Sequence, residues 1–409
     1  MVLTAAWAVL GATLEVVAQT PPALAPGCRR QVIGPLIANV PSIEVRPQFR
    51  LNGQPFPDAS AGVAVFTLWA SRPSDVFDGP QLSLGQTDTP PPPVRVVPGV
   101  YDVYYSWTSG SGIPRNQLTR VLRGVALRQD RVLIIDVPMI TIGGVKQHNG
   151  LPFGYDGVAE LRLRSVGRRG EVPLGGAQPS EFLVSLIPGT YTFEYDWQAG
   201  VALPRNRRAS VRRLLLSRSA PSLVLNVPSV IQDFAFLHNG QAFPPSMFDY
   251  GNIVLTRPGQ EEVAIGPTYE AGPAVRLIPG TYDAHWRHGA GASVPRNEDA
   301  KFRRGLIVNG SPLVIDVRSV EVSGDIRLNG QVPPGSAFDD ARLSLAVPNS
   351  PDRAYLSNTR YGAYQIRVVP GRYDVVYEHI VGAVVPGNTR ATLVRGWKVA
   401  AQPNRTIDI

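Results

Sequence analysis

The segment VVPGVYDVYYSW, Val96–Trp107, indicates how the whole chain is organised. Related segments follow as LIPGTYTFEYDW from Leu186, LIPGTYDAHWRH from Leu277 and VVPGRYDVVYEH from Val368, so the Pro-Gly pair recurs at steps of 90, 91 and 91 residues. Self-similarity at a fixed long period is typical of repeat proteins. The sequence therefore predicts four consecutive repeats of about 90 residues each.

Each recurring segment has the pattern of a half-buried β-strand. Tyr101, Val103 and Tyr105 alternate with more polar positions, and successive side chains of a strand point to opposite faces of the sheet. One face is therefore expected to line a core. The tyrosines expected to be structural core residues are Tyr101, Tyr191, Tyr282 and Tyr373. The acidic residues on the other face, which are expected to face water, are Asp102, Asp283 and Asp374.

Further landmarks recur in register with this strand. An Asn-Gly pair, the strongest short hairpin signal, precedes it at Asn52, Asn149, Asn239 and Asn329. Loops that begin with proline follow it, as Pro-Arg-Asn at Pro114, Pro204 and Pro295 and as Pro-Gly-Asn at Pro386. Each repeat ends in a β-branched strand that runs almost without a linker into the next repeat. Short strands with turn residues between them indicate an all-β protein made of sandwiches, and the short linkers predict an elongated, stiff rod.

The repeat landmarks set the predicted domain boundaries. The β-sandwich repeats are expected over 42–137, 138–227, 228–317 and 318–409. A signal-like, flexible segment is expected over 1–32 and an extra N-terminal strand over 33–41. This strand has the spacing of a terminal strand without its own domain. It either covers an edge of the first sandwich or pairs with a neighbouring subunit.

The N-terminal segment bears on localisation. A short apolar run from Leu3 to Ala12 is followed by small residues, as in a signal peptide, although the usual positive residues before the run are missing. Export is the favoured interpretation. Cys28, the single cysteine, follows a degraded lipoprotein box and is either a candidate lipidation site or an inert unpaired thiol.

The charge of the chain is concentrated in arginine. Formal net charge is +8, and of the 40 basic residues only three are lysine. The second repeat holds an arginine cluster, which is either a solvated face or a patch for acidic polysaccharide, lipid headgroups or phosphate. The residues of this candidate anionic-ligand surface, including those of the Pro-Arg-Asn loops, are Arg115, Arg205, Arg207, Arg208, Arg212 and Arg296. Trp69 and Trp397 are expected to be exposed and available to a carbohydrate.

The early Leu51-Asn52-Gly53 with Pro55-Phe56, followed by the Pro-Gly-x-Tyr strand, resembles carboxypeptidase regulatory-like and Cna B-type domains. The resemblance covers nearly all of residues 42–409. It implies four tandem immunoglobulin-like or transthyretin-like (prealbumin-like) β-sandwich repeats, which generally serve as stalks, spacers and adhesion units without catalysis. Some Cna B-type domains carry a Lys-Asn isopeptide bond. Because the three lysines here occupy unrelated repeat positions, no such bond is predicted.

The sequence contains no pattern that predicts catalysis. The five histidines are dispersed, and no metal-ligand spacing, nucleophile elbow or phosphate loop is present. We predict no enzyme activity, no cofactor, no metal and no nucleic-acid partner. The favoured function is a secreted or envelope-associated structural protein of the bacterial periplasm or outer surface, acting as a spacer, adhesion or assembly unit.

The predicted partners follow from the two chain ends. The partner is self or another surface protein, bound through terminal strands, and membrane contact occurs only through N-terminal anchoring. The alternative function is a carbohydrate- or anionic-ligand-binding module that uses the arginine-rich second repeat.

Overall fold

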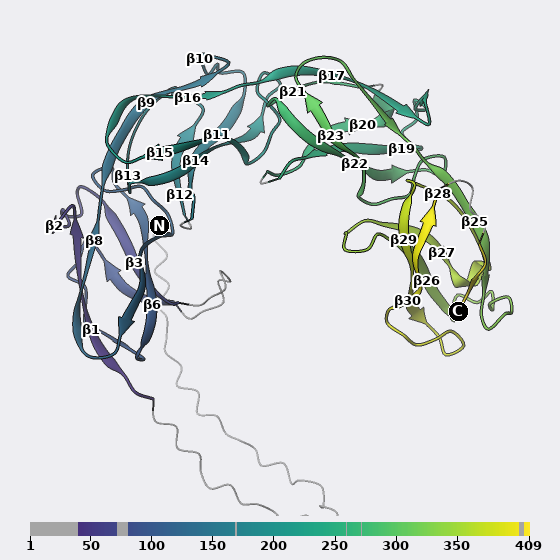
Figure 1. Ribbon diagram of the computed structural model, residues 1–409, viewed down its shortest axis with the longest axis horizontal. Coiled ribbons are helices and arrows are strands. Elements are labelled where there is room, and N and C mark those ends of the chain that lie inside the picture. The colour runs from purple at the N-terminus through teal and green to yellow at the C-terminus, as the bar shows by residue number, and fades with distance from the viewer. Residues whose placement is uncertain (1–39, 72–80, 168–169, 259, 271, 401–404) are drawn as a thin grey trace, which may run out of the picture. The chain divides into compact units, whose positions relative to one another are not determined.

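The computed structural model describes residues 40–71, 81–167, 170–258, 260–270, 272–400 and 405–409. Within them the chain forms β-strands and two short 3-10 turns, η1 (Thr268–Glu270) and η2 (Thr359–Tyr361) (Figure 1). The all-β fold class predicted from the sequence is confirmed. The signal-like segment with Cys28, and all of the predicted strand 33–41 except Val40 and Pro41, lie outside the described residues.

Four consecutive stretches of chain each form two sheets. We call them sandwich 1 (residues 43–137), sandwich 2 (140–227), sandwich 3 (230–317) and sandwich 4 (320–408). Within each, the Pro-Gly-x-Tyr strand is an inner strand of the first sheet, in the order β4-β3-β6-β7 for sandwich 1. The strands of these four sheets are β3 (Val63–Ala70), β4 (Gln81–Gln86), β6 (Gly99–Ser109) and β7 (Thr119–Leu127); β11 (Val158–Ser165), β12 (Glu171–Gly176), β14 (Gly189–Ala199) and β15 (Ala209–Leu216); β19 (Tyr250–Thr256), β20 (Val263–Pro267), β22 (Gly280–Ala290) and β23 (Ala300–Val308); and β26 (Asp340–Ala346), β27 (Arg353–Asn358), β29 (Gly371–Val381) and β30 (Ala391–Val399).

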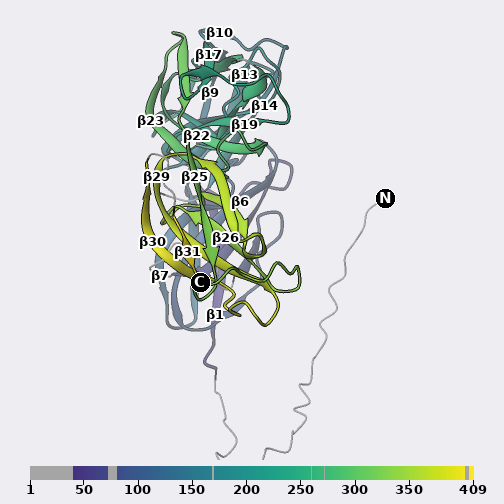
Figure 2. The same cartoon turned by 90° about the vertical axis from the view of Figure 1, so that its right-hand side faces the viewer.

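The second sheet of each sandwich joins its first strand to its last. In sandwich 1 these two strands run parallel, from the pair Val45 and Arg131 to the pair Leu51 and Val137. The strands of these sheets are β1 (Ile43–Leu51), β2 (Gln54–Pro55), β5 (Val94–Val96) and β8 (Arg131–Val137); β9 (Ile140–His148), β10 (Leu151–Pro152), β13 (Glu181–Leu186) and β16 (Ala220–Val227); β17 (Val230–His238), β18 (Gln241–Ala242), β21 (Ala274–Leu277) and β24 (Leu313–Val317); and β25 (Val320–Arg327), β28 (Ala363–Val368) and β31 (Ile407–Asp408). Figures 1 and 2 show the strands of sandwich 4 from two directions. The proposed domain boundaries and the rod stay predictions.

A hydrophobic core fills the space between the two sheets of each sandwich. The described residues contain four such core clusters. The alternation predicted for the Pro-Gly-x-Tyr strand is only partly present: Tyr191, Tyr282 and Tyr373 are each 1% exposed and Tyr101 is half-buried, but four consecutive residues of β6, from Asp102 to Tyr105, are all buried. Inward aromatic residues therefore anchor every core, as their large apolar area favours.

The Asn-Gly pairs form the predicted hairpin turns. Asn52 and Gly53 have φ of 51° and 79°, and the other three pairs have nearly the same angles. Two successive positive φ angles define the type I′ turn that the twist of two paired strands favours. The amide of Gly53 also donates to Oδ1 of Asp136 at 2.8 Å. This contact fixes the turn against the last strand of its own sandwich.

The prediction that Asp102 faces water is wrong. Asp102 is 7% exposed, and its carboxylate accepts hydrogen bonds from the Gly124 amide at 2.7 Å and from Arg120 at 3.2 Å. Asp283 and Asp374 are half-buried and accept the amides of Gly305 and Gly396 in the same way. These three glycines have φ between 62° and 69°, in the left-handed region that favours glycine. The aspartates are thus structural, because they hold an irregularity in the neighbouring strand.

Candidate functional site

The Pro-Arg-Asn loops join consecutive sandwiches through their asparagine. Asn116, Asn206 and Asn297 are fully buried. The side-chain oxygen of Asn116 accepts the Ile187 amide at 2.8 Å, and its Nδ2 donates to the Tyr191 hydroxyl at 2.9 Å. Both partners belong to the next sandwich. Asparagine supplies one acceptor and two donors at one position, so a single side chain can make both contacts.

The same contacts are present at the second and third junctions. Asn206 accepts the Ile278 amide at 2.8 Å and donates to Tyr282 at 2.9 Å. Asn297 accepts the Val369 amide at 2.8 Å and donates to Tyr373 at 3.0 Å. The residue before each asparagine adds a main-chain hydrogen bond to the next sandwich, from Arg115, Arg205 and Arg296 to Ser185, Arg276 and Arg367. We call this set of contacts the junction latch.

The tyrosine whose hydroxyl accepts the asparagine hydrogen bond also forms a tyrosine corner. The Tyr191 hydroxyl donates to the Ile187 carbonyl at 2.5 Å, and Tyr282 and Tyr373 donate to Ile278 and Val369 at 2.7 and 2.6 Å. Burial raises the pKa of Tyr282 and Tyr373, so these hydroxyls stay protonated donors at neutral pH. The hydroxyl of this tyrosine corner also accepts a hydrogen bond from the asparagine of the preceding sandwich.

An apolar side chain reinforces each latch. Ile187 is 1% exposed and belongs to the core cluster of sandwich 1, although it lies in sandwich 2. Ile278 and Val369 belong in the same way to the clusters of sandwiches 2 and 3. Burying a side chain of this size stabilises a contact by about 2 kcal/mol. Consecutive sandwiches therefore share core residues as well as hydrogen bonds.

The linker side of each junction is also held. The Asn52 side chain accepts the Met139 amide at 2.8 Å, and Asn149 and Asn239 accept the amides of Ser229 and Ser319 at 2.7 and 2.8 Å. The Asn-Gly turn of one sandwich thus binds the linker that leads into the next sandwich. With contacts at the linker and at the loop, each junction is held at two points.

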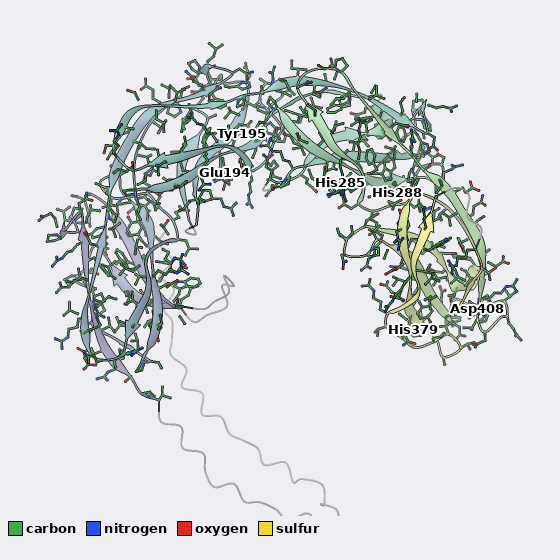
Figure 3. All side chains as sticks on the ribbon, viewed as in Figure 1. Glu194, Tyr195, His285, His288, His379 and Asp408 are labelled. Carbon is green, nitrogen blue, oxygen red and sulfur yellow. The ribbon has the colours of Figure 1, made fainter. Side chains whose placement is uncertain are left out.

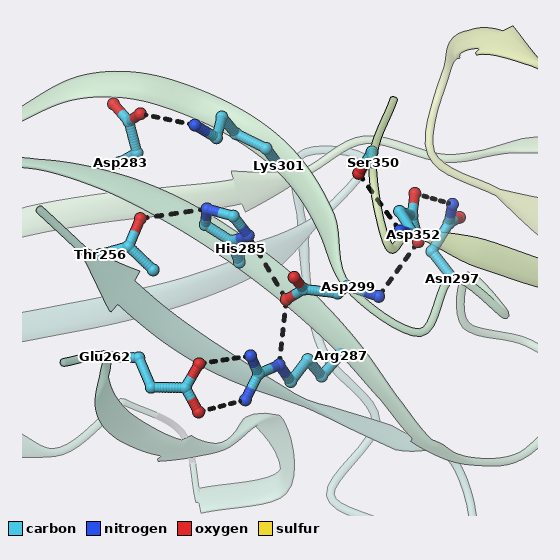
Figure 4. Close-up of polar contacts among 10 residues, drawn as sticks. All are labelled: Thr256, Glu262, Asp283, His285, Arg287, Asn297, Asp299, Lys301, Ser350 and Asp352. Carbon is cyan, nitrogen blue, oxygen red and sulfur yellow. Dashed lines mark hydrogen bonds and ion pairs between the residues drawn. The ribbon is translucent and has the colours of Figure 1, made fainter. Parts of the chain in front are cut away.

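The third junction contains a buried carboxylate. Asp352 is 2% exposed and accepts hydrogen bonds from the Asn297 side chain at 2.9 Å and from the Asp299 amide at 3.0 Å (Figure 4). Burial, opposed by these hydrogen bonds, raises the pKa of Asp352 to about 6, and the nearby Asp299 and Glu298 add to the shift. This junction therefore has an ionisable group that titrates in a mildly acidic range.

A polar network lies beside Asp352 in sandwich 3. Asp299 contacts His285 at 3.3 Å and Arg287 at 3.0 Å, and Arg287 also pairs with Glu262 (Figure 4). His285 bonds to Thr256 at 3.1 Å, and burial lowers the pKa of this histidine. Each charged group has a partner of opposite charge or a hydrogen bond, which is typical of a structural network.

The predicted anionic-ligand arginines are not gathered on one surface. Arg115, Arg205 and Arg296 are half-buried at three different junctions, and the Arg115 guanidinium lies 4.8 Å from the centre of the Trp107 ring. Arg212 is exposed on β15. Only Arg205, Arg207 and Arg208 come together, at the second junction. Binding of an anionic ligand by these arginines stays a prediction.

Glutamates oppose this arginine group. Arg207 and Arg208 pair with Glu261 at 3.7 and 3.1 Å. A cleft of about 700 Å³ at this junction is lined by Trp197, Arg205, Arg207, Glu261, Glu262 and Ala264. The two carboxylates reduce the positive potential that an acidic polysaccharide would need. The partner glutamates lie more than 50 residues away in the sequence, so spacing alone could not reveal them.

The two tryptophans expected to be exposed are buried, and that prediction is wrong. Trp69 and Trp397 are 7% and 8% exposed. Trp69 packs against Tyr104 with ring centres 5.3 Å apart, and the Arg405 guanidinium lies 5.5 Å from the centre of the Trp397 ring. Their large apolar area explains the burial. Neither ring is placed to stack on a sugar.

Sequence reasoning missed a buried lysine in sandwich 2. Lys146 is 2% exposed, and its ammonium donates to the Gly176 carbonyl at 2.6 Å and to the Leu174 carbonyl at 3.5 Å. Burial lowers the pKa of Lys146. Counting from the Asn-Gly turn, the other repeats have Phe49, Phe236 and Ile326 at this position. An amine therefore replaces a core apolar side chain, which an alignment on the Asn-Gly turn would have indicated.

The five histidines are distributed over sandwiches 2, 3 and 4. His379 lies on a different sandwich from His285 and His288 (Figure 3). Across the residues that the structure describes, no three His, Cys, Asp or Glu side chains come together as a metal site. The described part of the chain also contains no helix with the length and hydropathy of a membrane-spanning segment.

Comparisons with known proteins give distant similarity only. No protein-family model matches the chain, and no curated protein matches its sequence. Among solved structures, the Bacillus anthracis TIE protein is 11% identical, with 85% of this chain and 68% of that one covered and a TM-score of 0.19. A streptococcal ancillary pilin is 12% identical, with 68% and 99% covered and a TM-score of 0.22.

A third solved structure is a putative polysaccharide-binding protein of Bacteroides thetaiotaomicron, which is 11% identical, with 37% and 78% covered and a TM-score of 0.19. At these values the fold assignment rests on the chain's own sheets and cores. Membership in the Cna B-type or carboxypeptidase regulatory-like families stays a prediction.

Proposed function

We propose that this protein is a non-enzymatic structural repeat protein of the cell envelope or outer surface, which acts as a spacer or assembly unit. The junction latch is the observation that carries this proposal. The latch uses the same three contacts at three places, and it buries an asparagine, a tyrosine and an aliphatic residue each time. Such contacts stabilise a fixed succession of sandwiches, which is what a spacer requires.

The recurrent polar residues of the chain support a structural role. Asn116, Asn206 and Asn297 are used in junctions, and the aspartates of the Pro-Gly-x-Tyr strands bind backbone amides. A buried polar group is stabilising only when its hydrogen bonds are made, so these residues specify one arrangement of the chain. The asparagines and aspartates that recur in the sequence are therefore the residues whose hydrogen bonds stabilise the repeated fold.

Two measurements test the proposal. Fractionation of the native cells should place the protein in the periplasm, the envelope or the medium. Small-angle X-ray scattering of the purified full chain should show a single restricted arrangement that broadens in the triple variant Asn116→Ala, Asn206→Ala, Asn297→Ala. The matched control is Asn309→Ala, an exposed turn asparagine of sandwich 3. The proposal would be contradicted if the protein were found in the cytoplasm and the triple variant scattered like the Asn309→Ala control.

The alternative, a module for acidic glycans, is supported by the exposure of Arg207, Arg208 and Arg212. Its test is the affinity for an acidic polysaccharide such as heparin. The affinity should fall with salt, and it should disappear when these three arginines become Ser. Binding that persists in the triple Ser variant would place the ligand elsewhere.

A further inference from the structure

The junction loop of sandwich 4 makes the same internal hydrogen bonds as the other junction loops. The Tyr377 hydroxyl donates to the Pro386 carbonyl at 2.5 Å, as Tyr105 does to Pro114 at 2.6 Å. The His379 amide donates to the Asn388 carbonyl at 3.2 Å, and Val385 is 3% exposed. The loop therefore has the hydrogen bonds of the other three loops. Asn388, however, is exposed, whereas its three counterparts are fully buried.

The tyrosine corner of sandwich 1 is formed in the same way. The Tyr101 hydroxyl donates to the Val97 carbonyl at 2.5 Å, as Tyr191 does to Ile187. Val97 is 50% exposed, whereas the three residues at this position that fill a preceding core are between 1% and 7% exposed. Sandwich 1 thus presents an acceptor, and sandwich 4 presents the donor that fits it.

We propose that Asn388 of one copy binds the Tyr101 corner of a second copy and forms a fourth junction latch between chains. This inference rests on the proposed function as an assembly unit and names its partner, a second copy of this chain. By analogy with the three latches in the chain, the Asn388 side-chain oxygen accepts the Val97 amide. Its Nδ2 donates to the Tyr101 hydroxyl, and the Val97 side chain enters the end of the sandwich 4 core. The occupant is identified by continuity with an interface that the chain already makes three times.

The loop of sandwich 4 differs from the other loops in a way that suits contact between separate chains. Three apolar residues around it, Ile380, Val381 and Val384, are 48%, 39% and 58% exposed. The other sandwiches have smaller or more polar residues at these positions: Thr108, Gln198 and Gly289; Ser109, Ala199 and Ala290; and Gly112, Ala202 and Ser293. A junction within one chain is held by its linker, but separate chains must gain affinity from buried area.

The contact is heterologous, because different surfaces of the two copies meet. After two copies have bound, one copy keeps a free Tyr101 corner and the other keeps a free Asn388 loop, so association continues into chains instead of stopping at a symmetric dimer. The expected signature is a distribution of oligomers that grows with protein concentration. A single latch predicts a dissociation constant between about 10 µM and 1 mM.

Sedimentation velocity of the full chain over a concentration series tests the proposal. The wild type should show oligomers that increase with concentration. Asn388→Ala and Tyr101→Phe should each weaken association by about tenfold or more, because each removes a hydrogen bond of the latch. The matched controls are Asn309→Ala and Tyr155→Phe, an exposed asparagine and a tyrosine that is 90% exposed, and both should associate like the wild type.

A mixing experiment checks the direction of the contact. Asn388→Ala mixed with Tyr101→Phe should form dimers, because each variant keeps one intact half of the latch, and should form no longer chains. A wild type that stays monomeric at about 1 mM would overturn the latch. Association that survives both substitutions would overturn it too and favour pairing through terminal strands. Either result leaves the proposed function standing if fractionation places the protein outside the cytoplasm.

Discussion

Asn206 and Tyr282 lie in consecutive sandwiches, and the Asn206 amide donates to the Tyr282 hydroxyl at 2.9 Å with both side chains buried. The Tyr282 hydroxyl in turn donates to the main-chain carbonyl of Ile278. The main-chain amide of Ile278 donates to the side-chain oxygen of Asn206. One asparagine thus closes a ring of hydrogen bonds across two sandwiches. Because all groups of this ring are buried, removing one of them leaves its hydrogen-bond partners unpaired, and water does not replace the lost hydrogen bond.

Asn206→Ala should destabilise the second junction by about 2 kcal/mol, because the buried Ile278 amide loses its acceptor. The measurement is urea denaturation of the full chain, followed by hydrogen exchange of the Ile278 amide. Asn206→Asp keeps the acceptor and should recover part of the loss. Asn388→Ala is the control, since the same substitution at an exposed asparagine should leave monomer stability within about 0.5 kcal/mol. Equal effects at both positions would refute the junction latch.

Lys146→Met replaces a buried amine by an apolar side chain of similar volume, but it also leaves the Gly176 and Leu174 carbonyls without their donor, so the stability of sandwich 2 at neutral pH should change by no more than about 1 kcal/mol. Because the pKa of Lys146 is lowered in the folded protein, this side chain binds its proton more tightly in the unfolded state than in the folded state. Wild-type stability should therefore rise with pH up to about 10.5, while the variant lacks this rise. Thermal denaturation from pH 7 to pH 10 measures both effects. Lys398→Met, at an exposed position, should change neither.

Most of the fold could be predicted from local sequence patterns. The four Pro-Gly-x-Tyr segments form the expected strands β6, β14, β22 and β29, because turn residues followed by apolar and aromatic positions are local signals. The Asn-Gly turns follow for the same reason. Asp102 could not be assigned, since its partner Gly124 lies on another strand, and Lys146 was missed because composition does not show burial.

The candidate site was only half predictable. The sequence shows the recurring asparagine of the Pro-Arg-Asn loops but predicts the arginine beside it as the functional residue. The asparagine is the one that the next sandwich buries, and its partner tyrosine is 75 residues further along the chain at the first junction. A contact between repeats has no local signature, so spacing within one repeat could not assign it.

Asp352 predicts how the third junction responds to pH. The carboxyl has its pKa raised from 3.8 to about 6 in the folded protein, so between these values the folded state binds more protons than the unfolded state. Stability from this group is therefore highest below pH 4 and falls as pH rises through 6, by about 3 kcal/mol in total. Asp352→Asn should remove this fall. Denaturation of both proteins from pH 4 to pH 7, with Asp88→Asn at an exposed position as the control, measures the difference. A constant difference between wild type and Asp352→Asn would contradict the assignment.

Gly124→Ala tests how much the positive φ of Gly124 contributes to the strand irregularity that Asp102 stabilises. Gly124 has φ of 65° and no atom within 4 Å of an added Cβ, so a methyl group there meets no neighbour. The substitution should still cost about 1 kcal/mol, because an L-residue is strained in this region. Gly387→Ala is the matched control, with equally open space and no positive φ, and should be neutral or slightly stabilising. Asp102→Asn should be milder than Gly124→Ala, since its amide oxygen can still accept the Gly124 amide hydrogen. Urea denaturation of the three variants decides the order. If Gly124→Ala proves as neutral as Gly387→Ala, the positive φ is not needed, and the aspartate acts through Arg120 instead.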